Sequence, residues 1–333
     1  MSKSYYSTVS SWVFAIYQTL NNQGLDGNTI LSKCDLSISD IQITNHRIAV
    51  KQVKQLWTEA VAATNNDAFG LQVIDYLNDK ALNALTTATM ASTNLREAIL
   101  RFHRYYRVVS SGFILVIHDD EHLVLELQKT PSGEFIAPEA VDAAFGVMVK
   151  NVRQLIDAQL SPILLELTKP EPNNNSHYSQ VFQCPVHFNA HRNALSFPVS
   201  MLDIEIPNAN EMLAAHMEKY LSDVLSKLNE VELSRQLYLN LMQMLPSGTP
   251  TIIELANRLN MSERSLQRKL KTENTGFNDI LCELRLDLAK RYLKEEKYQI
   301  NEVSYLLGFS APSNFVRFFK KHMGYPPSQF LET

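Results

Sequence analysis

One short pattern occurs twice in the last hundred residues of this chain, at an offset of 48 positions. The first copy consists of Ile252, Glu254, Leu255, Ala256, Leu259, Asn260, Met261 and Ser262, and the second of Ile300, Glu302, Val303, Ser304, Leu307, Gly308, Phe309 and Ser310. In each copy an apolar ladder ends at a residue that tolerates positive φ, Asn260 or Gly308, and a second amphipathic helix opens at a Ser. A small residue, Ala256 or Ser304, lets two helices cross closely. The pattern therefore predicts two helix-turn-helix motifs, at about 252–273 and 300–322.

The second helix of each predicted motif has one apolar and one polar face. In the first copy Leu266 and Leu270 share a face, and the opposite face carries Arg264, Gln267, Arg268 and Lys271. In the second copy Phe315, Phe318 and Phe319 are expected to face inward. This leaves outward-facing Ser313, Asn314, Arg317, Lys320 and Lys321.

A protruding helix fits the major groove, where Arg commonly pairs with guanine and Gln with adenine. A basic stripe on one amphipathic helix is more often a plain solvated face, but two copies at a fixed offset favour double-stranded DNA as the partner. Between the copies, residues 277–293 show helical spacing without Gly or Pro. At ~1.5 Å per residue this helix is about 25 Å long, which suits two reading helices on adjacent turns of DNA, ~34 Å apart.

These residues resemble the DNA-binding domain of AraC/XylS transcription regulators. The resemblance is carried by residues 262–270, 284–289, 303–310, 315–320 and 324–327. It implies a domain over 234–333 in which Arg264, Gln267 and Arg268 occupy base-reading positions of the first recognition helix. It also implies that the base-reading positions of the second recognition helix are occupied by Pro312, Ser313, Asn314 and Arg317. RNA polymerase is the further partner that a regulator of this kind would contact.

The second copy departs from the family pattern. Ser304 replaces the usual Ala, Ala311 and Pro312 replace polar residues, and Leu331 stands where Arg often closes the domain. Proline is tolerated in a first helical turn, where its missing N–H would be unpaired anyway. It removes a base contact, however, so we expect the second helix to anchor phosphates more than it reads sequence.

Composition fits a two-part regulator. The chain has 333 residues, 45% of them hydrophobic, enough for two or three cores. From Ser234 onward the chain has 14 Lys and Arg and 10 Asp and Glu, whereas residues 1–233 have 17 Lys and Arg and 25 Asp and Glu. Affinity for phosphate is therefore expected only in the C-terminal part. Three widely spaced cysteines predict neither zinc nor a disulfide framework. With no signal peptide and no membrane span, we expect a soluble, cytoplasmic protein without cofactor or metal.

Residues 1–206 read as an α+β sensor domain, with helices around an antiparallel sheet. Helices are predicted at 9–20, 48–62, 94–108 (with Ser92 or Thr93 as cap) and from Pro138 to about Gln159, and strands at 113–118, 122–128, 163–168, 178–182 and 194–199. The stretch resembles the arabinose-binding-like N-terminal domain of one branch of the same family, on pieces such as 98–105, 181–188 and 195–202. This implies a small-molecule effector without fixing it as arabinose.

Candidate effector contacts lie in the run from Arg101 to Arg107. Arg101, His103, Tyr105 and Tyr106 have the chemistry to hold a carboxylate or stack on an aromatic ring. The same spacing also describes an ordinary helix with buried aromatics and solvated arginines, and we weigh that interpretation above the first. His118 and His122 as a metal pair, and Cys184 with His187 as a reactive thiol, lack further groups, so no catalytic or metal residue is predicted.

Between the predicted sensor domain and the predicted DNA-binding domain, residues 207–233 predict a helical linker, and its helix continues to about Leu245. Leu213, Met217, Tyr220, Val224 and Val231 form one apolar stripe, suited either to a second subunit or to intramolecular packing. Residues 246–250 then end the helix. A ligand would act by binding one arrangement of this joint better than another.

Three functions compete. The first is a DNA-binding transcription regulator controlled by a small-molecule effector. The second is a DNA-binding protein whose N-terminal domain only dimerises or binds proteins, which thermal shifts against metabolites would reveal by a lack of stabilisation. The third, an enzyme fused to a DNA reader, lacks an activated nucleophile in residues 1–233.

Overall fold

The computed structural model describes residues 6–43, 46–77, 83–130, 136–157, 159–207, 209–231, 233–273, 275–294 and 298–330. They divide into two compact units, 6–227 and 228–330, and each is described by itself. Leu331, one of the departures from the family pattern, lies outside the described residues. None of the described helices combines the length and apolar character needed to cross a bilayer.

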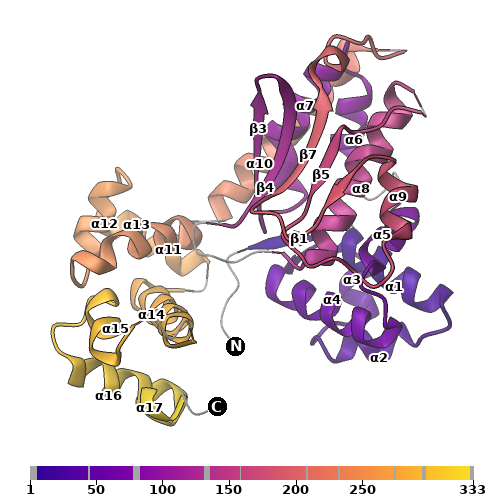
Figure 1. Cartoon of the computed structure of the whole chain (residues 1–333). Coiled ribbons are helices and arrows are strands. Elements are labelled where there is room, and N and C mark those ends of the chain that lie inside the picture. Colours follow the sequence, from indigo (N-terminus) through magenta and orange to yellow (C-terminus); the bar gives the residue numbers. More distant parts are fainter. Residues whose placement is uncertain are drawn as a thin grey trace. The chain divides into compact units, whose positions relative to one another are not determined.

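The first unit contains a five-stranded sheet with the order β3-β4-β7-β5-β6 (Figure 1). Its strands are β3 (Ile114–Asp119), β4 (His122–Gln128), β5 (Leu164–Glu166), β6 (Val186–His187) and β7 (Asn193–Pro198). Neighbours pair antiparallel except β5 and β6, which are parallel. On β4, Leu123, Leu125 and Leu127 are buried and alternate with more exposed residues, the period-2 pattern of a sheet with one face on a core. The predicted α+β fold is confirmed.

Helices α7 (Leu95–Tyr105) and α8 (Pro138–Leu155) pack against this sheet. The cap of α7 is Asn94, whose side chain accepts a hydrogen bond from Glu97 N at 2.9 Å, so the prediction of Ser92 or Thr93 as cap was wrong. Asn94 takes this position because its extended backbone places its side-chain oxygen over the first turn. Pro138 opens α8 at a position where no N–H is needed, and the α-helix ends at Leu155, earlier than predicted.

The segment Tyr178–Phe182, predicted as a strand, belongs to helix α9 (Ser176–Phe182). Tyr178 and Phe182 are both buried, and their four-residue spacing places them on one face of a helix. Gln183 ends the helix with φ 53°. The apolar content of the segment suited either structure, and the spacing of its two aromatics was the deciding signal.

A second core in this unit surrounds Trp57 and is built from short helices. Strands β1 (Ser7–Val9) and β2 (Arg47–Ala49) pair antiparallel, and each leads directly into a helix. The remaining α-helices of the unit are α1 (Ser10–Asn22), α2 (Gly27–Ser32), α3 (Ile38–Gln42), α4 (Val50–Thr64), α5 (Phe69–Val73), α6 (Asn83–Met90) and α10 (Glu211–Val231, whose last residues belong to the second unit). The helices predicted from residues 9 and 48 therefore start after three-residue strands.

A buried ion pair joins α8 to the sheet side of this unit. Asp142 accepts hydrogen bonds from Lys169 Nζ at 2.8 Å and from the Tyr178 hydroxyl at 2.6 Å. Burial raises the pKa of Asp142, and the same surroundings raise the pKa of Tyr178. Paired and hydrogen-bonded in this way, the charges hold α8, α9 and the chain after β5 in one arrangement.

The regular elements among the described residues of the second unit are all helices. Its α-helices are α11 (Leu233–Met244), α12 (Ile252–Arg258), α13 (Glu263–Thr272), α14 (Phe277–Lys294), α15 (Ile300–Leu306), α16 (Pro312–Met323) and α17 (Pro327–Phe330). One core joins them, with Leu237, Leu241, Leu266, Leu284 and Phe315 fully buried. The helix predicted to run to Leu245 is thus described as α10 and α11, in different units, with residue 232 outside the described part.

Candidate nucleic-acid interface

The first helix-turn-helix motif has the turn that its sequence predicts. Asn260 has φ 53°, in the left-handed region, and Ala256 is buried where α12 meets α13. Thr251 and Glu254 form a capping box at the start of α12, where the Thr251 N–H donates to Glu254 Oε2 at 2.8 Å. Ser262 caps α13 by accepting from Ser265 N at 3.2 Å. The backbone groups at these helix ends are therefore satisfied locally, which fixes where α13 begins.

Helix α13 turns its apolar residues inward and its basic residues outward. Leu266 and Leu270 are buried, and the four polar candidates Arg264, Gln267, Arg268 and Lys271 are all exposed. Gln267 Nε2 donates to Glu263 Oε1 at 2.9 Å. For Arg264 and Arg268 the described residues offer no hydrogen bond or ion pair, so both guanidinium groups keep all five donors available.

The second motif has a turn of the same kind, but another segment of the chain lies close to its turn residue. Gly308 has φ 70°, and a Cβ at this position would lie 2.8 Å from Gly248 O. Glycine is thus required for two reasons, its backbone conformation and the close approach of another chain segment. Ser304, the counterpart of Ala256 in the first motif, is fully buried. Helix α16 is not capped by Ser310 as predicted: Ala311 is its N-cap and Pro312 its first residue, because a proline ring presets φ for the first turn.

On α16, Phe315 and Phe319 are buried and Phe318 is partly buried against Phe309. Four of the candidates are exposed: Ser313, Arg317, Lys320 and Lys321. Asn314 is half-buried and is engaged on both sides. Its Nδ2 donates to Ser310 Oγ at 3.3 Å, and its Oδ1 accepts from Arg317 at 2.8 Å. Two of the four side chains expected at base-reading positions here, Asn314 and Arg317, thus already bond to each other.

Arg285 on α14 was missed by the sequence analysis. Its Nε donates to Leu307 O at 2.9 Å, and its NH2 donates to Gly308 O at 3.2 Å and to Thr249 Oγ1 at 2.7 Å. The guanidinium also lies over the Phe309 ring, 4.1 Å from its centroid, and burial lowers its pKa. Arg285 therefore fastens the second turn to α14, which lies between the two motifs (Figure 1). An arginine amid apolar residues of a predicted helix was the only sequence signal.

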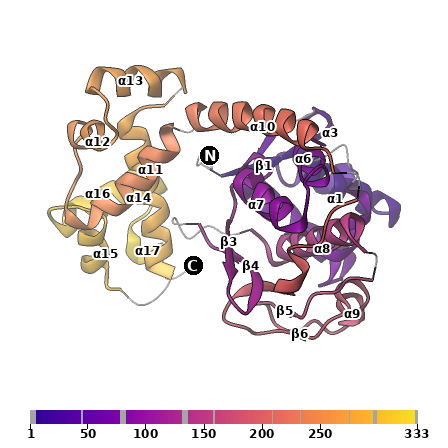
Figure 2. The same ribbon diagram turned by 90° about the horizontal axis from the view of Figure 1, so that it is seen from above.

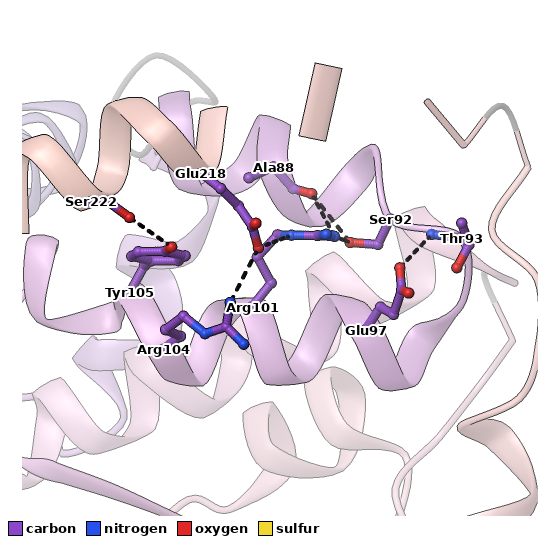
Figure 3. Close-up of polar contacts among 9 residues, drawn as sticks. All are labelled: Ala88, Ser92, Thr93, Glu97, Arg101, Arg104, Tyr105, Glu218 and Ser222. Carbon is purple, nitrogen blue, oxygen red and sulfur yellow. Dashed lines mark hydrogen bonds and ion pairs between the residues drawn. The ribbon is translucent and has the colours of Figure 1, made fainter. Parts of the chain in front are cut away.

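The four candidate effector contacts do not converge on one site. Figure 3 shows two of them, Arg101 and Tyr105, with their partners on α10. Arg101 Nε donates to Glu218 Oε1 of α10 at 2.8 Å, and Arg101 also contacts Ser92. The Tyr105 hydroxyl bonds to Ser222 Oγ, likewise of α10, at 2.9 Å. His103 Nε2 lies 3.1 Å from Leu115 O. These three residues make intramolecular contacts, of which those of Arg101 and Tyr105 hold α10 against α7. Figure 2 shows the course of α10 over α6 and α7.

Tyr106 is the exception, because it lines an internal cavity. The cavity lies among α1, α4, α7 and α8, has a volume of about 70 Å³, and is walled mainly by apolar side chains. Phe102, in the last turn of α7, lines it as well, and Tyr106 directly follows the end of that helix. One face of α7 therefore meets the cavity and another meets α10.

The apolar stripe predicted on the linker helix splits in the structure. Met217 packs with Leu221 and Leu225 against α6 and α7, whereas Leu213 and Tyr220 are 40% and 48% exposed. The face that packs inside the unit is thus centred one residue further along than the predicted stripe. The side chain of Val231 lies outside the described residues.

The remaining candidates for chemistry have ordinary surroundings. His118 Nε2 lies 3.2 Å from Glu126 Oε2, across the hairpin, and His122 is exposed. In the part of the chain that the structure describes, no three His, Cys, Asp or Glu side chains gather as metal ligands would. Burial raises the pKa of the Cys184 thiol to about 11, which keeps it protonated and unreactive at neutral pH.

Comparisons with known proteins match both units. Residues 24–206 match the arabinose-binding domain of AraC transcription regulators, N-terminal, and residues 255–333 match a helix-turn-helix domain. The chain is 29% identical to the ornithine utilization regulator of Pseudomonas aeruginosa, over 86% of this chain and 85% of that protein. It is 30% identical to the DNA-binding dual transcriptional regulator Rns of Escherichia coli, over 54% of this chain and 58% of Rns.

Among solved structures, the transcriptional regulator CdpR of Pseudomonas aeruginosa aligns with 95% of this chain and 98% of its own, at 20% identity and a TM-score of 0.44. The relatives are transcription regulators and not enzymes. With more than half of its length matched by the N-terminal family and its C-terminal part by the helix-turn-helix domain, this chain belongs to the AraC family of DNA-binding transcriptional regulators.

Proposed function

We propose that this regulator reads specific duplex sequences mainly through α13 and holds the phosphate backbone mainly through α16. The observation that carries the proposal is the outer face of α13, where Arg264, Gln267, Arg268 and Lys271 are exposed above two buried leucines. Arg and Gln have the donor and acceptor geometry that base edges require. On α16 the corresponding arginine is bonded to Asn314, and Lys320 and Lys321 supply charge without directional pattern.

The test is selection of binding sites by the purified full chain from a randomised duplex library. The wild-type chain should enrich one sequence class, and the double variant Arg264→Ala/Arg268→Ala should enrich none. A charge-matched control, Lys51→Ala/Lys219→Ala, removes two exposed cations from α4 and α10 and should select the wild-type sequence. If the arginine variant selects the same sequence as wild type, α13 is not the reading helix.

We propose further that a small molecule bound in the first unit modulates DNA binding. The cavity beside α7 supports this, because Phe102 of α7 and Tyr106, the residue directly after its end, line the cavity wall, while Arg101 and Tyr105 of α7 contact α10. A ligand that shifts α7 would alter its hold on α10, the helix that leads toward the DNA-binding unit. Energetically the ligand needs to favour one position of α7 over another.

The alternative, an N-terminal unit used only for association between subunits, has one observation in its favour. Met212, Leu213 and Tyr220 of α10 are 73%, 40% and 48% exposed, an unusual set of large apolar side chains at a surface. A homodimer through this face is compatible with effector control. Sedimentation of the Leu213→Asp/Tyr220→Asp variant tests whether this face forms a dimer. If the wild-type chain is a dimer and no small molecule changes its affinity for DNA, association between subunits is the sole role of the first unit.

RNA polymerase is the protein partner that we propose for the output of this regulator, with the bacterial cytoplasm as its place of action, since its proposed ligand is genomic DNA. Bacterial regulators among the relatives support this assignment. Crosslinking of the DNA-bound full chain to polymerase holoenzyme on a selected site tests it. An absence of crosslinks, together with unchanged transcription from that site, would contradict it.

A further inference from the structure

We propose that the cavity of the first unit binds a slender organic acid, an apolar ring or acyl chain that carries one carboxylate, with Lys54 receiving the carboxylate. This rests on the proposed effector control and names the chemical class of the effector. The family name of the domain refers to a sugar, and the ligand class inferred here differs from it because the cavity walls differ from those that a sugar needs.

The walls of the cavity are apolar and aromatic. Its aromatic side chains come from five positions: Trp12, Trp57, Phe102, Tyr106 and Phe113. Aliphatic residues of α4 and α8 complete the lining. The volume of about 70 Å³ corresponds to several water molecules at ~10–15 Å³ each, so the enclosed space is small.

The three hydroxyl groups in the lining, those of Thr8, Ser110 and Tyr106, are already hydrogen-bonded within the protein. Thr8 Oγ1 donates to Val109 O at 3.1 Å, and Ser110 Oγ accepts from Gly112 N at 3.2 Å. The Tyr106 hydroxyl donates to Phe113 O at 3.4 Å and accepts from Leu115 N at 3.3 Å. These groups face the cavity without needing a ligand, and a ligand gains little from them.

Besides the hydroxyl groups, the lining carries the polar ends of Lys54 and Asn151 and the indole N–H groups of Trp12 and Trp57. Lys54 is the one charged residue among the described residues of the lining, and it is exposed, which places it at the opening of the cavity. The described part of the chain offers its ammonium group no ion pair or hydrogen bond. A carboxylate at the mouth would meet this charge while the apolar body of the same molecule lies inside.

The lining excludes two other effector classes. A sugar buried here would leave hydroxyl groups unpaired, at a cost of about 1–3 kcal/mol for each. A diamino acid would bring ammonium groups to a lining whose described residues include no Asp or Glu. An apolar acid satisfies both constraints, because its only polar group is an anion that meets Lys54.

The chain supplies its own probe for the test. It contains two tryptophans, Trp12 and Trp57, and both line the cavity. Intrinsic tryptophan fluorescence of the purified full chain therefore reports occupancy without any reference to DNA. The ligands are octanoate and 3-phenylpropanoate, which compare chain with ring, their neutral amides octanamide and 3-phenylpropanamide, and L-arabinose.

We expect at least one acid to change the fluorescence with a saturable curve, and its amide to bind roughly threefold to tenfold more weakly. Lys54→Gln should weaken the acid by the same factor and leave the amide unchanged. Lys51→Gln, on the same helix but outside the lining, should match wild type. Because both changes lie at exposed positions, neither should prevent folding.

The outcomes separate this inference from the function on which it rests. Fluorescence that responds to neither acid, or that responds to arabinose instead, would overturn the ligand class. Acid and amide bound equally, with no effect of Lys54→Gln, would overturn the carboxylate assignment. An acid that binds with the expected Lys54 dependence, but leaves the affinity for the selected duplex unchanged, would support the cavity and refute effector control of DNA binding.

Discussion

The two helix-turn-helix motifs share a pattern but differ in how freely their recognition helices present side chains. In the first, Asn260 makes the turn, and Arg264 and Arg268 of α13 extend without intramolecular partners among the described residues. In the second, Gly308 packs against the backbone of Gly248, and Arg317 is bonded to Asn314. A repeated fold thus does not imply a repeated task, because neighbours decide which donors remain available to DNA.

The largest expected effect is on the second turn itself. Gly308→Ala combines a strained φ of 70° with a Cβ 2.8 Å from Gly248 O, so we expect a loss of about 2–5 kcal/mol in the free energy of unfolding. Asn260→Ala, at φ 53°, should lose only about 1 kcal/mol. Urea unfolding of the full chain, followed by circular dichroism, measures both losses. Tryptophan fluorescence is not used, because both tryptophans lie in the first unit and do not report on unfolding of the second. Equal losses would show that the second turn is no tighter than the first.

The next effect distinguishes the two recognition helices. Arg268→Ala should weaken binding to a selected duplex by about 1–3 kcal/mol and remove the preference at one base pair. Arg317→Ala should cost less and leave the sequence preference intact, because its guanidinium is engaged with Asn314. Fluorescence anisotropy with a selected duplex and its single-base variants measures both properties. A change of preference in Arg317→Ala alone would reverse the assigned roles.

The smallest expected effect is that of removing a lysine that contributes positive charge to phosphate binding but reads no base. Lys320→Ala should weaken all duplexes alike and lower the slope of log affinity against log salt by about 0.9, the value for one phosphate contact. The measurement is a salt titration with a selected and an unrelated duplex. Lys51→Ala provides the control and should leave the slope unchanged. If Lys320→Ala weakens only the selected duplex, α16 reads sequence after all.

The features that follow from local sequence were predictable. The turn residues Asn260 and Gly308, and the buried faces formed by Leu266 and Leu270 and by Phe315, are set by spacing along a few turns of chain. The α+β character of the first unit was also accessible, because β4 alternates buried and exposed residues in the expected way.

Features that depend on distant partners were not predictable. Arg285 anchors the second turn across 22 residues, and Arg101 finds Glu218 across 117, so neither role is written in the local pattern. Arg101 and Tyr105 looked like ligand contacts because charge and aromaticity on a helix do not reveal what lies opposite them. The cavity likewise draws its walls from four separate helices and the segments between them, and only Tyr106 of the predicted contacts lines it.

The ion pairs between α7 and α10 share a single carboxylate, that of Glu218. Glu218 accepts from Arg101 at 2.8 Å and lies 3.7 Å from Arg104, and the Arg101 side chain is only 14% exposed. Replacing Glu218 by a neutral residue would leave the nearly enclosed guanidinium of Arg101 without a counter-charge, and at the same time release Arg104. Both ion pairs between these helices therefore depend on one acidic position, so a change there removes them together and leaves α10 held by the Tyr105–Ser222 hydrogen bond and the apolar packing around Leu221.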